Sequence, residues 1–187
     1  MILASNSKRR QEILRDMGFN FKVLTADIEE ISDKKEISEM ILDIAEKKLD
    51  KIAKENINEF VLAADTVVEL EGRIFGKPKS REEAESFLKT LSGKTHKVIT
   101  AYVFKNISKN IVIKDVVISK VKFYDLDDET IKWYLDTSEP FDKAGAYGIQ
   151  GQGRVLVEKI EGDYFPVSNF LKNLRKNGYK ISQIDRI

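Results

Sequence analysis

The spacing of apolar residues at the start of the chain predicts a strand followed by a helix. Residues 2–4 are apolar, and after a polar segment Ile13, Leu14 and Met17 recur at helical spacing. Gly18 follows at once, and glycine favours the end of a helix. We therefore expect a strand, a polar turn and a helix before this glycine.

A long amphipathic helix is expected from residue 37. Ile41, Ile44, Lys48 and Ile52 share one helical face, so that a lysine lies on an apolar stripe. The same periodicities and capping residues predict the other elements. Strands are expected over residues 19–25, 60–64, 73–75, 97–104, 111–123 and 154–160, and residues 66–70 are expected to continue the strand of residues 60–64 in extended conformation. Helices are expected from Ser80 to residue 91, from Asp127 to residue 135 and over residues 167–176.

Helices and strands alternate along the chain without strict βαβ regularity. This order predicts a mixed α/β fold with two lobes, in which helices flank a strongly twisted mixed sheet and a cleft lies at the centre. The length of 187 residues fits one domain or two small lobes that share a core. We expect a single domain over residues 1–187, with no repeat or linker.

Composition excludes several classes of site and partner. The 32 Lys and Arg residues balance the 31 Asp and Glu residues, so no global charge attracts nucleic acid or anionic membrane. Cysteine is absent and histidine occurs once, which excludes disulfides, thiolate nucleophiles and histidine-rich metal sites. Neither a signal peptide nor an apolar run of about 18 residues is found, so we expect a cytoplasmic protein without a membrane span.

A polar segment lies where the first strand enters the first helix. It contains Ser5 and Ser7, followed by the cations Lys8, Arg9 and Arg10. Helix N-termini bind anions, and cations are unfavourable in a first helical turn unless an anion compensates them. Phosphate binding is one interpretation; the alternative is that Ser7 only caps the helix and the cations are solvated.

Asp65 directly follows the apolar run of residues 61–64, at the end of a predicted buried strand. Ligand groups commonly follow such strands, and this carboxylate could bind Mg²⁺ or Mn²⁺ or accept a proton from water. The alternative is an aspartate that caps a turn. Asp27, Glu29 and Glu30 follow another strand and could complete a metal site, but three acids are also typical of a solvated loop.

Lys48 and Lys77 are candidate phosphate ligands. Lys48 lies on the apolar face of its helix, and Lys77 lies between Gly76 and Pro78, which restrict the local backbone. Taken singly, each lysine is more simply explained by a long side chain whose charged end reaches water.

The glycine-rich segment over residues 144–153 is a candidate base-binding loop. Four glycines there permit close backbone approach, Tyr147 could stack on a base, and Gln150 could pair with a base edge. His96, at the start of a strand, is expected to have a structural role. Trp133 and Tyr134 are expected to lie in the core.

Together these segments resemble the Maf family over most of the chain. The resemblance rests on short motifs in a specific order: residues 3–10 (LASNSKRR), 62–68 (LAADTVV), 76–78 (GKP), 91–96 (LSGKTH) with Val98 and Thr100, and 143–151 (KAGAYGIQG). One departure is the sequence of residues 168–170, Ser-Asn-Phe, where many members have a Gly-Leu-Pro turn.

The resemblance implies a two-lobed fold similar to the inosine triphosphate pyrophosphatases, a divalent metal (Mg²⁺, Mn²⁺ or Co²⁺) and often a homodimer. It implies hydrolysis of a nucleoside triphosphate to the monophosphate and pyrophosphate. Asp65 resembles the proton acceptor; the residues that resemble those binding triphosphate and metal are Ser5, Ser7, Arg9, Glu30, Lys48 and Lys77. Asp65 and Glu30 would hold the metal.

Arg10, Thr66 and Gln150 resemble the residues of the branch that acts on dTTP and UTP, with modified pyrimidine nucleotides as further candidate substrates. Two alternatives remain open. One is a pyrophosphatase of the branch that acts on 7-methyl-GTP, and the other is a regulator that inhibits septation or binds nucleic acid or protein. The balanced charge argues against direct binding of nucleic acid.

Overall fold

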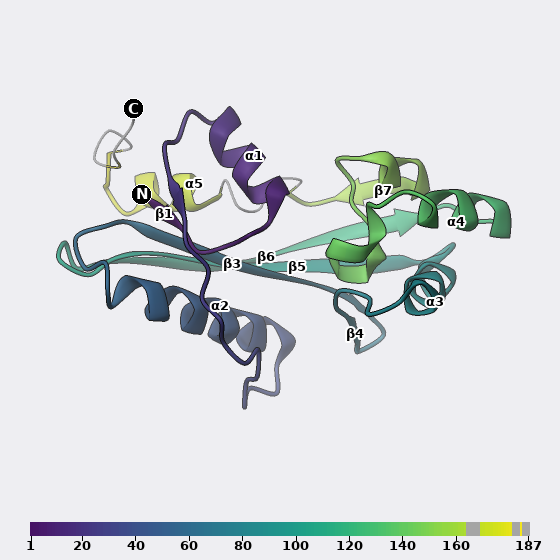
Figure 1. Ribbon diagram of the computed structural model, residues 1–187, viewed down its shortest axis with the longest axis horizontal. Helices are drawn as coiled ribbons and strands as arrows, with labels where there is room; N and C mark the ends of the chain where they lie inside the picture. The colour runs from purple at the N-terminus through teal and green to yellow at the C-terminus, as the bar shows by residue number, and fades with distance from the viewer. Residues whose placement is uncertain (164–168, 181–183, 185–187) are drawn as a thin grey trace. The chain divides into compact units, whose positions relative to one another are not determined.

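The computed structural model describes residues 1–163, 169–180 and 184 and has a mixed α/β fold (Figure 1). The strands are β1 (Ile2–Leu3), β2 (Lys22–Val23), β3 (Val61–Leu70), β4 (Arg73–Phe75), β5 (Thr95–Asn106), β6 (Ile111–Phe123) and β7 (Val157–Glu161). The α-helices are α1 (Lys8–Asp16), α2 (Ile37–Ala53), α3 (Arg81–Leu91), α4 (Asp128–Leu135) and α5 (Asn169–Lys176). Short 3₁₀ turns are η1 (Pro140–Asp142), η2 (Ala144–Ala146) and η3 (Gln152–Leu156).

Within the described residues, the strands form one sheet in the order β2-β1-β3-β5-β6-β7, with β4 paired to β3. Strand β1 is parallel to both β2 and β3, whereas β4 runs antiparallel to β3 and β7 antiparallel to β6. The prediction of a mixed sheet in an α/β fold is therefore confirmed. No helix among the described residues is long and apolar enough to cross a membrane.

The chain divides into two compact units, and each has its own hydrophobic core. Unit 1 comprises Met1–Asp65, Thr100–Val117 and the described part of Phe165–Ile187. Unit 2 comprises Thr66–Ile99 and the described part of Ile118–Tyr164. The long strands β3, β5 and β6 each contribute residues to both units.

In unit 1, the alternation of side chains along β3 assigns its residues to two faces of the sheet. Leu62 and Ala64 belong to a core that also contains Leu14 of α1 and Phe170 of α5. Helix α2 covers the opposite face (Figure 1). Because successive side chains of a strand point to opposite faces, Asp65 points toward the face that α2 covers.

In unit 2, helices α3 and α4 pack into a core with strand residues and with the glycine-rich segment. Phe87 of α3, Tyr134 of α4 and Tyr147 of this segment all belong to that core. Ser80 caps α3 as predicted, because its Oγ accepts a hydrogen bond from the backbone N–H of Glu83 at 3.2 Å. The segment that carries Gln150 is thus attached to a packed core.

Four expectations about local structure need correction or fall outside the described residues. Strand β2 has two residues instead of seven, and β7 begins at Val157 because η3 precedes it. Helix α5 begins at Asn169, and residues 167 and 168 lie outside the described part of the chain. Tyr134 is fully buried as expected, but Trp133 is 46% exposed. Neighbouring residues of a helix point about 100° apart, so one apolar face did not accommodate both rings.

Candidate active site

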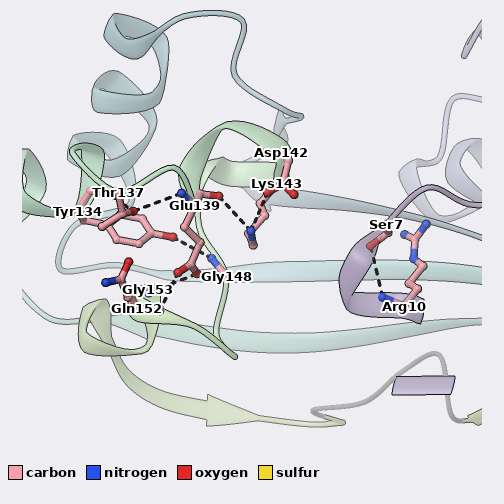
Figure 2. Close-up of polar contacts among 10 residues, drawn as sticks. All are labelled: Ser7, Arg10, Tyr134, Thr137, Glu139, Asp142, Lys143, Gly148, Gln152 and Gly153. Carbon is pink, nitrogen blue, oxygen red and sulfur yellow. Dashed lines mark hydrogen bonds and ion pairs between the residues drawn. The ribbon is translucent and has the colours of Figure 1, made fainter. Parts of the chain in front are cut away.

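The turn between β1 and α1 is organised by two serines. The Ser7 Oγ accepts a hydrogen bond from the backbone N–H of Arg10 at 3.5 Å and so caps α1 (Figure 2). The buried Ser5 Oγ accepts hydrogen bonds from the Ser7 N–H at 3.3 Å and from Arg10 Nη1 at 3.0 Å. The capping role of Ser7 is confirmed, but the basic residues after it are not all solvated, because Arg10 turns inward.

Arg10 links this turn to strand β3. Its Nη1 also donates to the carbonyl oxygen of Ala64 at 2.7 Å. Burial of the guanidinium lowers the pKa of Arg10 to about 10, while the negative charges of Asp65 and Glu30 act in the opposite direction and the positive charge of Arg9 adds to the lowering. Arg10 remains cationic at neutral pH, and it is surrounded by the charged residues that the sequence singled out.

Lys48 connects two of the predicted acidic residues. Its Nζ lies 2.8 Å from Asp65 Oδ1 and 2.7 Å from Glu30 Oε1. The side chains of Lys48 and Asp65 are 16% and 15% exposed, whereas Glu30 is 60% exposed. The ammonium therefore lies between two carboxylates instead of reaching freely into water, so the simpler interpretation of Lys48 was wrong.

The strand around Asp65 differs from the expectation in one respect. Strand β3 continues through Asp65 to Leu70, so this residue lies within a strand and neither ends it nor caps a turn. The pairing of β1 with β3 reaches Leu3 and Leu62. Asp65 lies three residues beyond Leu62 on β3, and Ser5 lies two residues beyond Leu3 in the turn that follows β1.

Two further lysines of α2 hold the segment that carries Glu30, and sequence reasoning missed them. Lys47 Nζ donates to the carbonyl oxygen of Ile31 at 2.9 Å, and Lys51 Nζ donates to the carbonyl oxygen of Asp27 at 2.5 Å. Asp27 thus contributes its backbone oxygen to this contact. The signal in the sequence was the group of lysines near the end of a helix that follows an acidic segment.

The donor set of unit 1 fits a divalent cation of the magnesium type. Mg²⁺ in proteins is commonly bound by one or two carboxylates together with phosphate oxygens and water. Glu30 and Asp65 supply two carboxylates that meet at one ammonium, and each has a second oxygen. In the part of the chain that the structure describes, no group of three or more His, Cys, Asp or Glu side chains forms a metal site by itself.

Thr66, Lys77 and Gln150 belong to unit 2. Thr66 is half-buried in β3, while Lys77 and Gln150 are exposed. The carbonyl oxygen of Gly76 accepts a hydrogen bond from the N–H of Gly145 at 3.0 Å. This bond ties the segment of Lys77 to the start of the glycine-rich loop.

The glycine-rich loop is held by side chains of this same unit (Figure 2). Glu139 Oε2 accepts a hydrogen bond from the N–H of Gln152 at 2.7 Å, and the hydroxyl of Tyr134 accepts one from the N–H of Gly148 at 3.2 Å. Glu139 was not among the residues chosen from the sequence. Asp136 and Asp142 lie three residues to either side of Glu139, so the sequence has no signal that singles this acid out.

Tyr147 does not have the exposed ring that stacking on a base would need. It is 5% exposed and packs edge-on against Phe123 and His96, with ring centroids 4.7 Å and 5.4 Å away. Its hydroxyl lies 2.6 Å from His96 Nε2. Burial lowers the pKa of His96 to about 4, so the ring is neutral at physiological pH. The structural role expected for His96 agrees with this buried hydrogen bond.

Residues 1–169 match the family model described as Maf-like protein. A dTTP/UTP pyrophosphatase of Fusobacterium nucleatum subsp. nucleatum is 78% identical over 192 residues, which cover 100% of both chains. A dTTP/UTP pyrophosphatase of Pyrococcus furiosus is 45% identical over 190 residues, covering 98% of each chain. Among solved structures, the Ham1 protein of Staphylococcus aureus has a TM-score of 0.48 at 16% identity, covering 95% of this chain and 98% of that one. The sequence relatives, and not this loose structural likeness, carry the assignment.

Proposed function

Because this chain belongs to the Maf-like protein family, we propose that it is a nucleoside triphosphate pyrophosphatase that hydrolyses dTTP and UTP to the monophosphate and pyrophosphate. The observation that carries the proposal is the contact of Lys48 with both Asp65 and Glu30, beside the buried guanidinium of Arg10. Such a set combines a proton acceptor with cations suited to a polyanion. The relatives named dTTP/UTP pyrophosphatase favour this branch over the one that acts on 7-methyl-GTP.

The reaction is a displacement at phosphorus in which the protein mainly positions groups and neutralises charge. Asp65 accepts a proton from the water whose oxygen forms a bond to the α-phosphorus. The bond between this phosphorus and the oxygen bridging to the β-phosphate breaks, and pyrophosphate leaves with that bonding electron pair. Proton acceptance by a positioned carboxylate is typically worth about 10²–10⁴ in rate.

The basic residues of unit 1 bind the triphosphate and stabilise the leaving group. Lys48 and Arg9 offset its negative charge, and the turn with Ser5 and Ser7 offers hydroxyls and the N-terminus of α1. Lys77, exposed in unit 2, is assigned to the same task. Glu30 and Asp65 would hold a divalent cation, Mg²⁺, Mn²⁺ or Co²⁺, which when bound supplies further positive charge beside the phosphates.

The direct test is the identity of the products. We expect pyrophosphate and the nucleoside monophosphate from dTTP and UTP in the presence of a divalent cation, and no turnover after chelation. In ¹⁸O-labelled water, the label should enter the monophosphate, because water attacks the α-phosphorus. Release of orthophosphate with a nucleoside diphosphate, or label in pyrophosphate, would refute the mechanism. A panel of modified pyrimidine triphosphates would then identify preferred substrates.

Base choice is assigned to Gln150, with Arg10 and Thr66 placing the nucleotide. A glutamine amide offers a donor and an acceptor that can match the O4 and N3–H of uracil or thymine, whereas cytosine inverts this pattern. Gln150→Ala should lower kcat/KM for UTP and dTTP far more than for CTP. The matched control is Gln152→Ala, since the contact of Gln152 with Glu139 uses its backbone N–H and survives the change. An equal loss on all nucleotides with Gln150→Ala would contradict the assignment.

We extend the proposal to a homodimer, which the family resemblance implies, and to a location in the cytoplasm. Sedimentation of the purified protein would test the dimer, and cell fractionation would test the compartment. A role as a regulator that binds nucleic acid predicts affinity that falls with salt, which filter binding across salt concentrations would detect.

A further inference from the structure

The tip of the glycine-rich loop is exposed, but the residues on either side of it are anchored. Gln150, Gly151 and Gln152 are exposed, while Gly148 and Gly153 are buried. The tip, which carries Gln150, is therefore short and lies between two buried glycines.

Glu139 and Tyr134 hold the two ends of the tip by hydrogen bonds. The Glu139 carboxylate accepts hydrogen bonds from the N–H groups of Gln152 at 2.7 Å and Gly153 at 3.4 Å. On the other side of the tip, the hydroxyl of Tyr134 accepts a hydrogen bond from the N–H of Gly148 at 3.2 Å. Burial and the nearby negative charge of Glu139 raise the pKa of this phenol. The Glu139 carboxylate thus holds one end of the tip, and the buried Tyr134 phenol holds the other.

The glycines of the loop leave room for the side chains that pack against them, which are Glu139 at Gly151, Lys143 and Glu139 at Gly148, and Tyr134 at Gly153. A Cβ atom on Gly151 would lie 2.4 Å from Glu139 Oε2, and one on Gly148 would lie 2.9 Å from Glu139 Oε1. On Gly153 it would lie 2.7 Å from the Tyr134 hydroxyl. The closeness that the glycines permit is therefore used, at least in part, by the protein's own side chains.

The backbone of Glu139 is itself held by hydrogen bonds at its N–H and at its carbonyl oxygen. Its N–H donates to Thr137 Oγ1 at 3.3 Å, and its carbonyl oxygen accepts a hydrogen bond from Lys143 Nζ at 3.0 Å (Figure 2). The same ammonium contacts Asp142 Oδ1 at 2.6 Å. Thr137 Oγ1 in turn donates to the carbonyl oxygen of Tyr134 at 2.7 Å, so the anchor is connected to a fully buried residue of α4.

We propose that Glu139 is a positioning residue that fixes the loop backbone that carries Gln150 and thereby sets the preference for uracil and thymine over cytosine. This inference rests on the proposed function. A glutamine amide on a mobile loop can rotate and shift to pair with either pattern of donors and acceptors, so discrimination requires a loop backbone that limits the placements open to this side chain. Glu139 acts through the loop backbone and needs no contact with the nucleotide.

The test compares Glu139→Gln with the control Glu129→Gln, which removes the same charge from an exposed position of α4. Glutamine has nearly the same size as glutamate, but its side chain has one acceptor oxygen where the carboxylate has two. We expect the ratio of kcat/KM for UTP to that for CTP to fall about tenfold in Glu139→Gln and to stay unchanged in the control. In a Gln150→Ala background the same change at Glu139 should leave this ratio unaltered, because the positioned side chain is already gone.

Two results would overturn the inference. One is an equal loss of kcat/KM for UTP and CTP, which means that Glu139 only supports the fold. The other is a full effect of Glu139→Gln on the ratio in the Gln150→Ala background. Rescue of the ratio by Glu139→Asp, which restores the charge and both acceptors on a shorter side chain, would support it further.

Amide hydrogen exchange separates this inference from the proposed function. Loss of a hydrogen bond to a charged group should speed exchange at Gln152 about tenfold or more in Glu139→Gln. If the unaltered protein releases no pyrophosphate, the proposed function fails and base choice with it, while exchange still decides whether Glu139 holds the loop. Unchanged exchange at Gln152 and Gly153 would overturn the positioning role whatever the activity.

Discussion

Replacing Asp65 by asparagine should remove activity and leave the fold intact. The amide has nearly the same shape, and its oxygen can still accept the hydrogen bond that Lys48 now donates to Oδ1 at 2.8 Å. Lys48 also keeps its ion pair with Glu30. What disappears is the negative charge and the proton acceptor, which are the two properties that the reaction needs.

The magnitudes of the two effects differ widely. A hydrogen bond to a charged group contributes about 1.5–3 kcal/mol and a neutral one about 0.5–1.5 kcal/mol, so unfolding should become easier by about 1 kcal/mol. For a chain of this length that lowers Tm by about 2–4 °C. Loss of a positioned proton acceptor lowers kcat by about 10²–10⁴.

The assay is pyrophosphate release from UTP, combined with thermal unfolding of the same samples. The matched control is Asp50→Asn on α2, because Asp50 Oδ1 accepts a hydrogen bond from Lys105 Nζ at 2.7 Å within the same unit. We expect a similar small fall in Tm and unchanged kcat in this control. If Asp65→Asn keeps kcat within about tenfold of the original, below the range expected for a proton acceptor, Asp65 is structural and the mechanism is wrong.

Three further predictions concern stability. Gly145→Ala should lower the free energy of unfolding by about 3 kcal/mol, because φ is +70° and the new Cβ would lie 2.7 Å from Val68 Cγ2, whereas Gly72→Ala, at φ +83° in open space, should lower it by about 1–2 kcal/mol. Chemical denaturation measures both free energies, and equal losses would contradict the clash with Val68. Burial lowers the pKa of His96 to about 4, so the free energy of unfolding should fall by about 3 kcal/mol as pH decreases from 6.5 toward 4, since in this range only the unfolded state binds the proton. His96→Gln should lack this part of the pH dependence, and a pH profile identical to that of the original protein would refute the prediction. Lys48→Met should lower Tm by leaving the carboxylates of Asp65 and Glu30 without their ammonium, and Mg²⁺ should raise the Tm of this variant more than that of the original protein. Equal responses of the two proteins to Mg²⁺ would argue against a cation site at these carboxylates.

Much of the local structure could be predicted from the sequence, because it depends on neighbouring residues. The helix after Ser80 begins where its cap predicts, and the lysine on the apolar face of α2 is half-buried as its position requires. Element boundaries were less predictable where packing decides, as in the two-residue strand β2 and the late start of β7. The predicted roles of the site residues came from resemblance, since isolated acids and lysines are equally typical of solvated surfaces.

The sequence by itself determined the mixed α/β class, the order of elements and the residue types available for chemistry, because periodicity and composition are properties of the chain. Only the tertiary structure decided which of these residues meet. Lys48 contacts Asp65 and Glu30 because α2 covers the face of the sheet to which Asp65 points. Likewise, Tyr147 is a core residue and Glu139 a loop anchor, because burial and hydrogen bonding depend on neighbours that are distant in the sequence.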